Sequence, residues 1–332
     1  MPNNWRAAPF ADKTMPEHPP TGWRSISTSL AYRIAAWTVW YWRFDALADE
    51  RHFTEMAPDE GLQALPPAGK AGRGTFVFPA YPVSAAPPAV AAREGRLVYT
   101  PKTFPNYYVD LKLEGGFERY LQGFSSKSRS TLKRKVRRYA EADSTGELHW
   151  RVYRSPEEIA EFLPQAGALS ARTYQARLLD VGLPEGPEFR AQAMALAASG
   201  QARGFILFLD GRPAAYVYCS CRNGVATYDY VGHDPALNAL SPGTVLQYKI
   251  LEYLFEDPQM RVFDFTEGEG EHKAMFATGR MLCAKSLVFG LRPGIRLLVR
   301  LHWLTGRADE ALDALLDRLG IRRALRRLIR RA

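Results

Sequence analysis

Short apolar runs separated by polar turn sequences are clearest between residues 202 and 232. The segments ARGFILFLD (202–210), AAYVYCS (214–220) and VATYDYVG (225–232) each read as a strand, and the turn sequences DGRP and RNG separate them. Strands joined by such short turns pair antiparallel. The pattern therefore predicts a three-stranded meander inside a mixed, mostly antiparallel sheet.

Helical periodicity surrounds this meander. Apolar residues repeat at helical spacing within 117–124 and 132–139, Pro156 opens a helix capped by Ser155, and another helix covers about 187–199. A helix is predicted over 244–255, with these residues buried: Val245, Leu246, Ile250, Leu251, Leu254 and Phe255. RVFDF (261–265) and CAKSLVFG (283–290) read as the last strands, so the fold class is α/β (α+β), a sheet flanked by helices.

These patterns divide the chain into five segments. Residues 1–22 are rich in proline and polar groups and predict a disordered lead-in, and 23–115 form a first domain with strand candidates TFVF, RLVYT and YYVDLKL. Residues 116–145 are basic linking helices, 146–292 the main domain, and 293–332 amphipathic C-terminal helices. The apolar stretch 34–42 is too short to span a membrane and predicts a core helix or strand.

Composition indicates a folded protein without structural metal. The 332 residues are 46% hydrophobic and 24% charged, which excludes a wholly disordered chain and favours two domains. Cys219, Cys221 and Cys283 are too few for a disulfide framework and lack zinc-site spacing, so no metal is expected. Cys219 and Cys221 are predicted to share a buried strand face. The N-terminus shows no secretory signal, so we expect a cytoplasmic protein.

The net charge of +9 predicts an anionic partner, and much of it lies in two runs. In the run at 125–138, Lys127, Arg129 and Arg134 are candidates to bind phosphate on a donor or acceptor. The same run could instead be the solvated face of a helix, or bind nucleic acid, although no RNA-recognition motif is present.

The second basic run lies in the C-terminal helices. From Gly294 onward the leucines repeat at helical spacing, with most arginines on the other side. Such a helix can lie on an anionic membrane surface, or it can pack its apolar face against the core. The pattern leaves both alternatives open.

A possible phosphate site precedes the helix at 244–255. The residues nearest to the start of that helix are Ser241, Gly243, Thr244 and Gln247, within SPGTVLQ. A helix N-terminus presents unpaired amides and partial positive charge, and glycine permits close approach of a ligand. The alternative is an ordinary capped helix start after a proline-glycine turn.

Candidate catalytic residues gather in FDFTEGEGEHKAMFATG (263–279). The segment places Asp264, Glu269, His272 and Lys273 just past a strand end. A carboxylate or an imidazole can act as a general base, and a lysine ammonium can hold a carbonyl oxygen or a phosphate. A solvated acidic loop followed by a helix-start lysine is the alternative.

Four ordered pieces resemble the GNAT acyltransferases, and more narrowly their FemAB-related, CelD/BioF2-like branch. The pieces are FERYLQGFSSKSRSTLKRKVRR, LDGRPAAYVY, LSPGTVLQYKILEYLF and FDFTEGEGEHKAMFATG. The resemblance implies a GNAT-like fold in which 23–115 is a second, degenerate GNAT-like half.

The resemblance also assigns site residues. It maps the pattern of that branch onto Asp264, Gly268, Glu269 and Lys273, with His272 where an aromatic residue is usual. Either Glu269 or His272 could be the base. The usual glycine-rich phosphate loop is reduced to Gly243.

The implied function is an N-acyltransferase that uses acyl-CoA or acetyl-CoA. The acceptor would be an amine of an envelope glycan or lipid precursor, such as a long-chain base, and the enzyme would be peripheral on the inner face of the membrane. Direct attack is expected, because no cysteine or serine lies in a nucleophile motif. The alternatives are a Fem-like transferase that takes its acyl group from aminoacyl-tRNA, and a catalytically silent adaptor of polysaccharide biosynthesis.

Overall fold

The computed structural model describes residues 21–34, 37–66, 74–172 and 182–318. Contacts divide the chain into two compact units: unit 2 comprises residues 105–280, and unit 1 comprises the residues before and after it. The chain passes from one unit to the other within β5 (Arg96–Asp110) and again at the start of β11 (Gly279–Gly290). The N-terminal and C-terminal parts therefore share unit 1, which the segment boundaries predicted from the sequence did not anticipate.

Unit 2 is built on a mixed sheet with the strand order β5-β10-β9-β8-β7-β6. Its remaining strands are β6 (Trp150–Tyr153), β7 (Ala202–Leu209), β8 (Arg212–Arg222), β9 (Val225–His233) and β10 (Val262–Glu267). β7, β8 and β9 form the predicted antiparallel meander. β10 pairs with β9 in parallel and with β5 antiparallel, so the sheet is mixed as expected.

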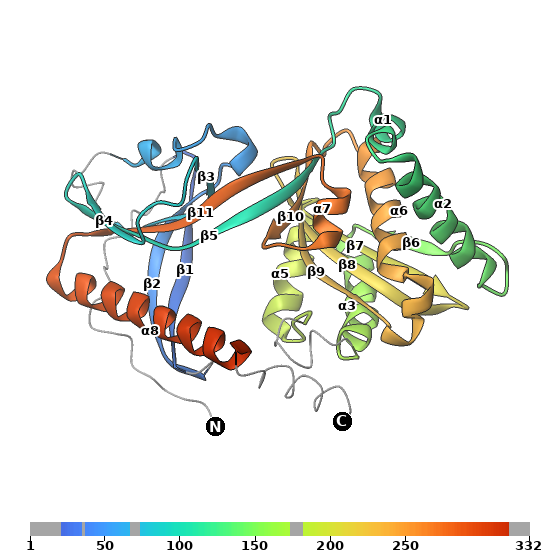
Figure 1. Cartoon of the computed structure of the whole chain (residues 1–332). Helices are drawn as coiled ribbons and strands as arrows, with labels where there is room; N and C mark the ends of the chain where they lie inside the picture. The colour runs from blue at the N-terminus through green and yellow to red at the C-terminus, as the bar shows by residue number, and fades with distance from the viewer. Residues whose placement is uncertain (1–20, 35–36, 67–73, 173–181, 319–332) are drawn as a thin grey trace. The chain divides into compact units, whose positions relative to one another are not determined.

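Helices cover both faces of this sheet (Figure 1). On one face lie α1 (Gly116–Gln122), α2 (Ser126–Glu141) and α6 (Pro242–Glu256), and on the other lie α3 (Pro156–Ser170) and α5 (Pro187–Ala198). Because side chains alternate along a strand, Phe205 and Leu207 pack on the α6 side while Ile206 packs on the α3 side. Cys219 and Cys221 share the α6 side and are buried, as predicted.

Local sequence signals explain where two helices begin. The Ser155 hydroxyl accepts a hydrogen bond from the amide of Glu158, whose carboxylate in turn accepts from the amide of Ser155. This capping box confirms the predicted start of α3 at Pro156. The helix predicted over 244–255 begins slightly earlier, at Pro242, and its apolar residues are buried as expected, with Phe255 partly buried.

Unit 1 contains β1 (Trp23–Ile34), β2 (Trp37–Asp49), β3 (Phe76–Pro82), β11 and the first part of β5, in the order β1-β2-β3-β11-β5. A short strand, β4 (Val90–Arg93), pairs with β5. Helix α8 (Pro293–Arg318) packs Ile295 and Val299 into a core that includes Leu30, Trp42 and Phe44.

Two expectations for this unit were wrong. The stretch 34–42 is not one core element: β1 ends at Ile34, the antiparallel strand β2 begins at Trp37, and three residues of β2 are exposed, namely Val39, Trp40 and Tyr41. The strand candidates 96–100 and 107–113 belong to one long strand, β5, which ends at Asp110. Proline keeps an extended φ and loses only its own N–H donor, so Pro101 and Pro105 do not end the strand.

No helix in the described part of the chain is long and apolar enough to cross a membrane. The lead-in 1–20 and the C-terminal arginines beyond Arg318 lie outside the described residues.

Candidate functional site

A cavity of about 720 Å³ lies in unit 2, where three elements end or begin. Its walls come from the second half of β9, from the 3-10 helix Pro235–Leu240 with the start of α6, and from α7 (Glu271–Phe276). The lining residues are Tyr228, Val231, Gly232, His233, Pro235, Asn238, Ser241, Pro242, Gly243, Thr244, Gly270, His272 and Lys273. Five residues predicted from the sequence therefore meet here: Ser241, Gly243, Thr244, His272 and Lys273.

The opening of the cavity follows from the pairing of β9. Its parallel register with β10 covers only Val225 to Thr227, so the next residue, Tyr228, is free to line the cavity. The register with β8 also shifts here, because Tyr228 pairs with Cys219 but Tyr230 pairs with Tyr218. Asp229 is therefore the extra residue of a β-bulge, a feature that bends a strand locally.

The start of α6 offers donors to the cavity. Ser241 takes a left-handed conformation (φ 55°), and its side chain makes no cap hydrogen bond to the helix. The amides of Thr244 and Val245 donate to the carbonyl oxygen of Ser241. The amide of Gly243 and the partial positive charge of the helix N-terminus are therefore what this end offers to an anion. Lys135, on α2, adds a full positive charge, with its Nζ 3.5 Å from Oγ1 of Thr244.

The short helix α7 is held in place from both ends. Phe276 is buried in the core, and its carbonyl oxygen accepts a hydrogen bond of 2.7 Å from the hydroxyl of Tyr120. Lys273 donates from Nζ to the carbonyl oxygens of Glu267 (2.7 Å) and Thr266 (3.2 Å). Lysine thus joins the helix to the end of β10 while it lines the cavity.

His272 is neutral at physiological pH. Burial, together with the positive charges of Lys135 and Lys273, lowers its pKa to about 4. Its ring packs against Phe276, with 5.1 Å between the ring centroids. Its Nε2 atom is buried and has no hydrogen-bond partner among the described residues. A neutral imidazole nitrogen without a partner is available to accept a proton.

Four other predicted residues do not line the cavity. Asp264 accepts a 2.8 Å hydrogen bond from the amide of Thr266, and thereby supports the positive φ (61°) of that residue. Gly268 has a φ of 101°, which favours glycine, so it shapes the turn. Glu269 is exposed, and Gln247 is fully buried one helical turn inside the α6 start.

The predicted phosphate-binding residues of α2 are dispersed. The guanidinium of Arg129 donates to the carbonyl oxygens of Phe124 (2.7 Å) and Gln122 (3.1 Å), so it holds the connection between α1 and α2. Lys127 and Arg134 are exposed. The residue of α2 that contacts a lining residue of the cavity, Thr244, is Lys135, which the sequence analysis missed. Its position beside the apolar stripe of Leu132 and Tyr139 is the signal that could have found it.

Asp229 is the second residue that the sequence analysis missed. Although the residue retains exposed surface, burial raises the pKa of its carboxyl to about 6, and the nearby charge of Asp264 acts in the same direction. Its Oδ2 accepts a 2.6 Å hydrogen bond from the amide of Ser220. The bulge that places it beside Tyr228 depends on strand register and has no local sequence signal.

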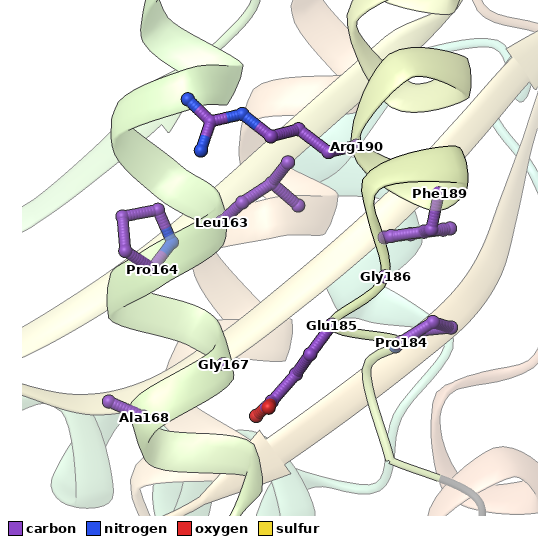
Figure 2. Close-up of a pocket in the computed structure, with 9 residues that line it drawn as sticks. All are labelled: Leu163, Pro164, Gly167, Ala168, Pro184, Glu185, Gly186, Phe189 and Arg190. Atoms are coloured by element: carbon purple, nitrogen blue, oxygen red, sulfur yellow. The ribbon is translucent and has the colours of Figure 1, made fainter. Parts of the chain in front are cut away.

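A second, smaller cavity of about 260 Å³ lies between α3 and α5 (Figure 2). Among the residues described there, the charged lining residues are Glu185 and Arg190, whose charged groups lie apart in the figure. None of the predicted site residues lines it. Within the described residues, no group of histidine, cysteine or acidic side chains could hold a metal ion.

Comparison with known proteins matches the middle of the chain to one family model. Residues 126–274 match the family model described as an acetyltransferase (GNAT) domain. The chain is an acyltransferase with a GNAT-like fold. The matched range includes Lys135, the start of α6 and both His272 and Lys273. No curated protein matches the chain.

Solved structures are similar at low sequence identity. The crystal structure of FemX has a TM-score of 0.51 with 13% identity, and the match covers 84% of this chain and 90% of FemX. The DUF2156 domain of a proposed lysylphosphatidylglycerol synthetase from Agrobacterium fabrum has a TM-score of 0.46 with 17% identity, over 82% of both chains. The FemX likeness supports the fold, and the lower score of the second carries no argument.

Proposed function

We propose that the protein is an N-acyltransferase that moves an acyl group from acyl-CoA to an amine of an envelope glycan or lipid precursor. The observation that carries this proposal is the cavity in which the start of α6, His272 and Lys273 meet. Its α6 end combines the positive end of the helix, at Gly243, with the charge of Lys135, which suits the phosphates of a donor. Its α7 end holds a neutral histidine, which suits proton removal from the acceptor.

The reaction needs one proton acceptor. An ammonium group first loses a proton, and its nitrogen then attacks the thioester carbonyl carbon. The C–S bond breaks as the amide C–N bond forms, a second proton of the nitrogen passes to the departing sulfur, and CoA leaves as the thiol. We assign removal of the first proton, from the ammonium, to Nε2 of His272. The ring is then in the tautomer that carries its own proton on Nδ1. Bound phosphate beside Lys135 and Lys273 would offset their charges and raise the pKa of His272 toward the range that suits a base. Glu269 is the weaker candidate, because it is exposed and outside the cavity.

The burial of the three cysteines favours direct transfer of the acyl group, without a covalent enzyme intermediate. Cys219, Cys221 and Cys283 are all buried, and burial raises the pKa of Cys221 to about 12 and that of Cys219 well above its ordinary value. A thiol is nucleophilic as the thiolate, so a cysteinyl intermediate is disfavoured.

The donor can be tested by thermal protection. Acetyl-CoA and longer acyl-CoAs are expected to raise the Tm of the purified protein, because a ligand that binds only the native state stabilises it by mass action. Lys135→Gln should weaken this binding about fivefold to tenfold, the effect of losing one charge-assisted contact. Lys133→Gln is the matched control, since it removes an exposed lysine two positions away on α2. No protection by any acyl-CoA would exclude this donor.

Aminoacyl-tRNA is the second candidate donor. The observation in its favour is the exposed basic surface of α2, formed by Lys127, Lys133, Arg134, Arg137 and Arg138. Salt-sensitive tRNA binding that acyl-CoA does not compete with would favour this donor. The double variant Lys133→Gln/Arg134→Gln should then weaken binding, whereas it should leave acyl-CoA protection unchanged.

We also propose that the enzyme works peripherally at the inner face of a membrane. The net charge of +9 favours an anionic surface, and a lipid or envelope precursor is the acceptor proposed above.

A further inference from the structure

Helix α8 carries two apolar faces. Its inner face, with Ile295 and Val299, is buried against unit 1, where the hydroxyl of Tyr32 also donates to the carbonyl oxygen of Leu298 at 3.0 Å. Figure 1 shows the helix lying across β1 and β2. This packing agrees with one of the two alternatives for the C-terminal pattern, but it uses only one side of the helix.

The outer face of α8 is apolar and exposed. Leu297, Leu301 and Leu304 are 59%, 44% and 54% exposed, and their spacing of four and three residues places them in one stripe. At about 100° per residue, this stripe lies opposite Ile295 and Val299. Isolated exposed leucines are common on protein surfaces, but a continuous stripe of this kind marks an interaction site.

Arginines border this stripe along one side. Arg296 and Arg300 are four residues apart on the helix, and Arg300 is a helical neighbour of Leu297 and Leu304. Both arginines are exposed, and neither forms an ion pair within the described part of the chain. A leucine stripe edged by unneutralised arginines matches a surface that is apolar below and anionic at its boundary.

An exposed tryptophan lies beside the same helix. Trp40 is on the face of β2 that carries Trp42, which α8 covers, yet it is 41% exposed. Its ring contacts Tyr32, and Tyr32 contacts His302 of α8, with centroid distances of 4.9 and 5.2 Å. Trp40 therefore lies next to the middle of the helix. Tryptophan favours the boundary between lipid headgroups and acyl chains.

We propose that the outer α8 surface, formed by Leu297, Leu301, Leu304, Arg296, Arg300 and Trp40, docks on an anionic lipid bilayer. The leucines enter the interface, and the arginine stems lie along it with their guanidinium groups at the lipid phosphates. A second copy of the chain fits this surface less well, since a two-fold pairing would bring the same unneutralised arginines together. The proposal deepens the peripheral position proposed above and locates it in unit 1, apart from the cavity residues of unit 2.

The test is flotation of the full chain with two kinds of vesicle. One is phosphatidylcholine alone, and the other contains about 30% phosphatidylglycerol, which gives it the negative surface charge of an anionic leaflet. We expect binding to the anionic vesicles only. Leu297→Glu/Leu301→Glu/Leu304→Glu should weaken it at least about tenfold, because the stripe loses its apolar area and gains negative charge. Arg296→Gln/Arg300→Gln should weaken it about fivefold per arginine. Trp40→Phe should remove part of the tryptophan quenching by brominated lipid.

Leu282→Glu is the matched control, since it changes a leucine of β11 that is 38% exposed and lies outside α8. Far-UV circular dichroism and Tm show whether each variant folds. If the leucine variant does not fold, the arginine variant still tests the surface. Unchanged vesicle binding in the folded variants, or no binding by the wild type, would overturn the proposal. A dimer that the leucine variant converts to a monomer would assign the surface to a second copy. Transfer to a water-soluble amine should persist in the leucine variant, which separates failure of docking from failure of the proposed reaction.

Discussion

The ammonium of Lys273 lies 2.7 Å from the carbonyl oxygen of Glu267 and donates a hydrogen bond to it. This contact ties the first turn of α7 to the end of β10 and keeps the positive charge of Lys273 at the wall of the cavity. The same side chain thus orders the loop and contributes to the field at His272.

Replacing Lys273 should affect transfer more than stability. In Lys273→Met the loop carbonyls of Thr266 and Glu267 lose a charged donor, so we expect kcat/KM to fall at least about tenfold. The free energy of unfolding should fall by about 1–2 kcal/mol, as for one partly exposed charged hydrogen bond. Lys273→Arg is the control that keeps the charge and should retain more activity. Full activity in Lys273→Met would show that this lysine has no role in transfer.

His272 should make the protein less stable in acid. Its pKa is about 4 in the folded protein and about 6.5 in an unfolded chain, so the unfolded state takes up the proton first as the pH falls. Its contribution is fully present above pH 6.5 and is lost between about pH 6.5 and 4, up to about 3 kcal/mol. Urea denaturation at pH 7 and pH 4.5 should show a smaller loss in His272→Gln than in the wild type. Equal losses in both proteins would contradict the low pKa of His272.

Asp229 should have the opposite effect. Because burial raises its folded pKa to about 6, the native state binds the proton more tightly, and that stability is lost as the pH rises from about 4 to 6. Asp229→Asn is therefore expected to stabilise the protein at pH 7 by about 1 kcal/mol, a value reduced for the solvent exposure of this residue. No gain is expected at pH 4. Asp45→Asn, at an exposed aspartate of β2, is the control.

Asp229, the bulge residue, should also affect the rate of acyl transfer. A carboxylate kept at an unfavourable pKa beside a cavity is typical of functional sites, so kcat/KM of Asp229→Asn should fall about tenfold while stability rises. Stabilisation with unchanged activity would assign the bulge a purely structural role.

The buried ion pair of unit 2 should be sensitive to removal of one partner. Nη2 of Arg203 lies 3.6 Å from Oδ2 of Asp257, and the two side chains are only 1% and 7% exposed. Arg203→Met leaves a buried carboxylate without its counter-ion and should cost about 3–5 kcal/mol of unfolding free energy. Because Arg203→Met/Asp257→Asn removes both charges, the double variant should be more stable than Arg203→Met alone. A loss below about 1 kcal/mol in Arg203→Met would mean that water reaches the pair.

Features that depend on neighbouring residues were predictable from the sequence. The meander of β7, β8 and β9, the capping box at Ser155 and the buried stripe of α6 each arise from spacing over a few residues. Local periodicity and capping act within one or two turns, so one sequence is enough to see them. The segment 263–279 was likewise singled out by its own cluster of acids, histidine and lysine.

Features that depend on long-range register needed the tertiary structure. The bulge at Asp229 exists because β8 and β9 pair on either side of it, and Lys135 reaches Thr244 across 109 positions of sequence. The sequence pattern also could not show which of Glu269 and His272 lines the cavity. Phe276 anchors α7 in the core, and His272, four residues before it, shares its face and lines the cavity, while Glu269 precedes the helix and stays exposed. The sequence by itself determined which elements form and singled out the segment to which we assign the chemistry, whereas packing between distant strands and helices decided which side chains face one another.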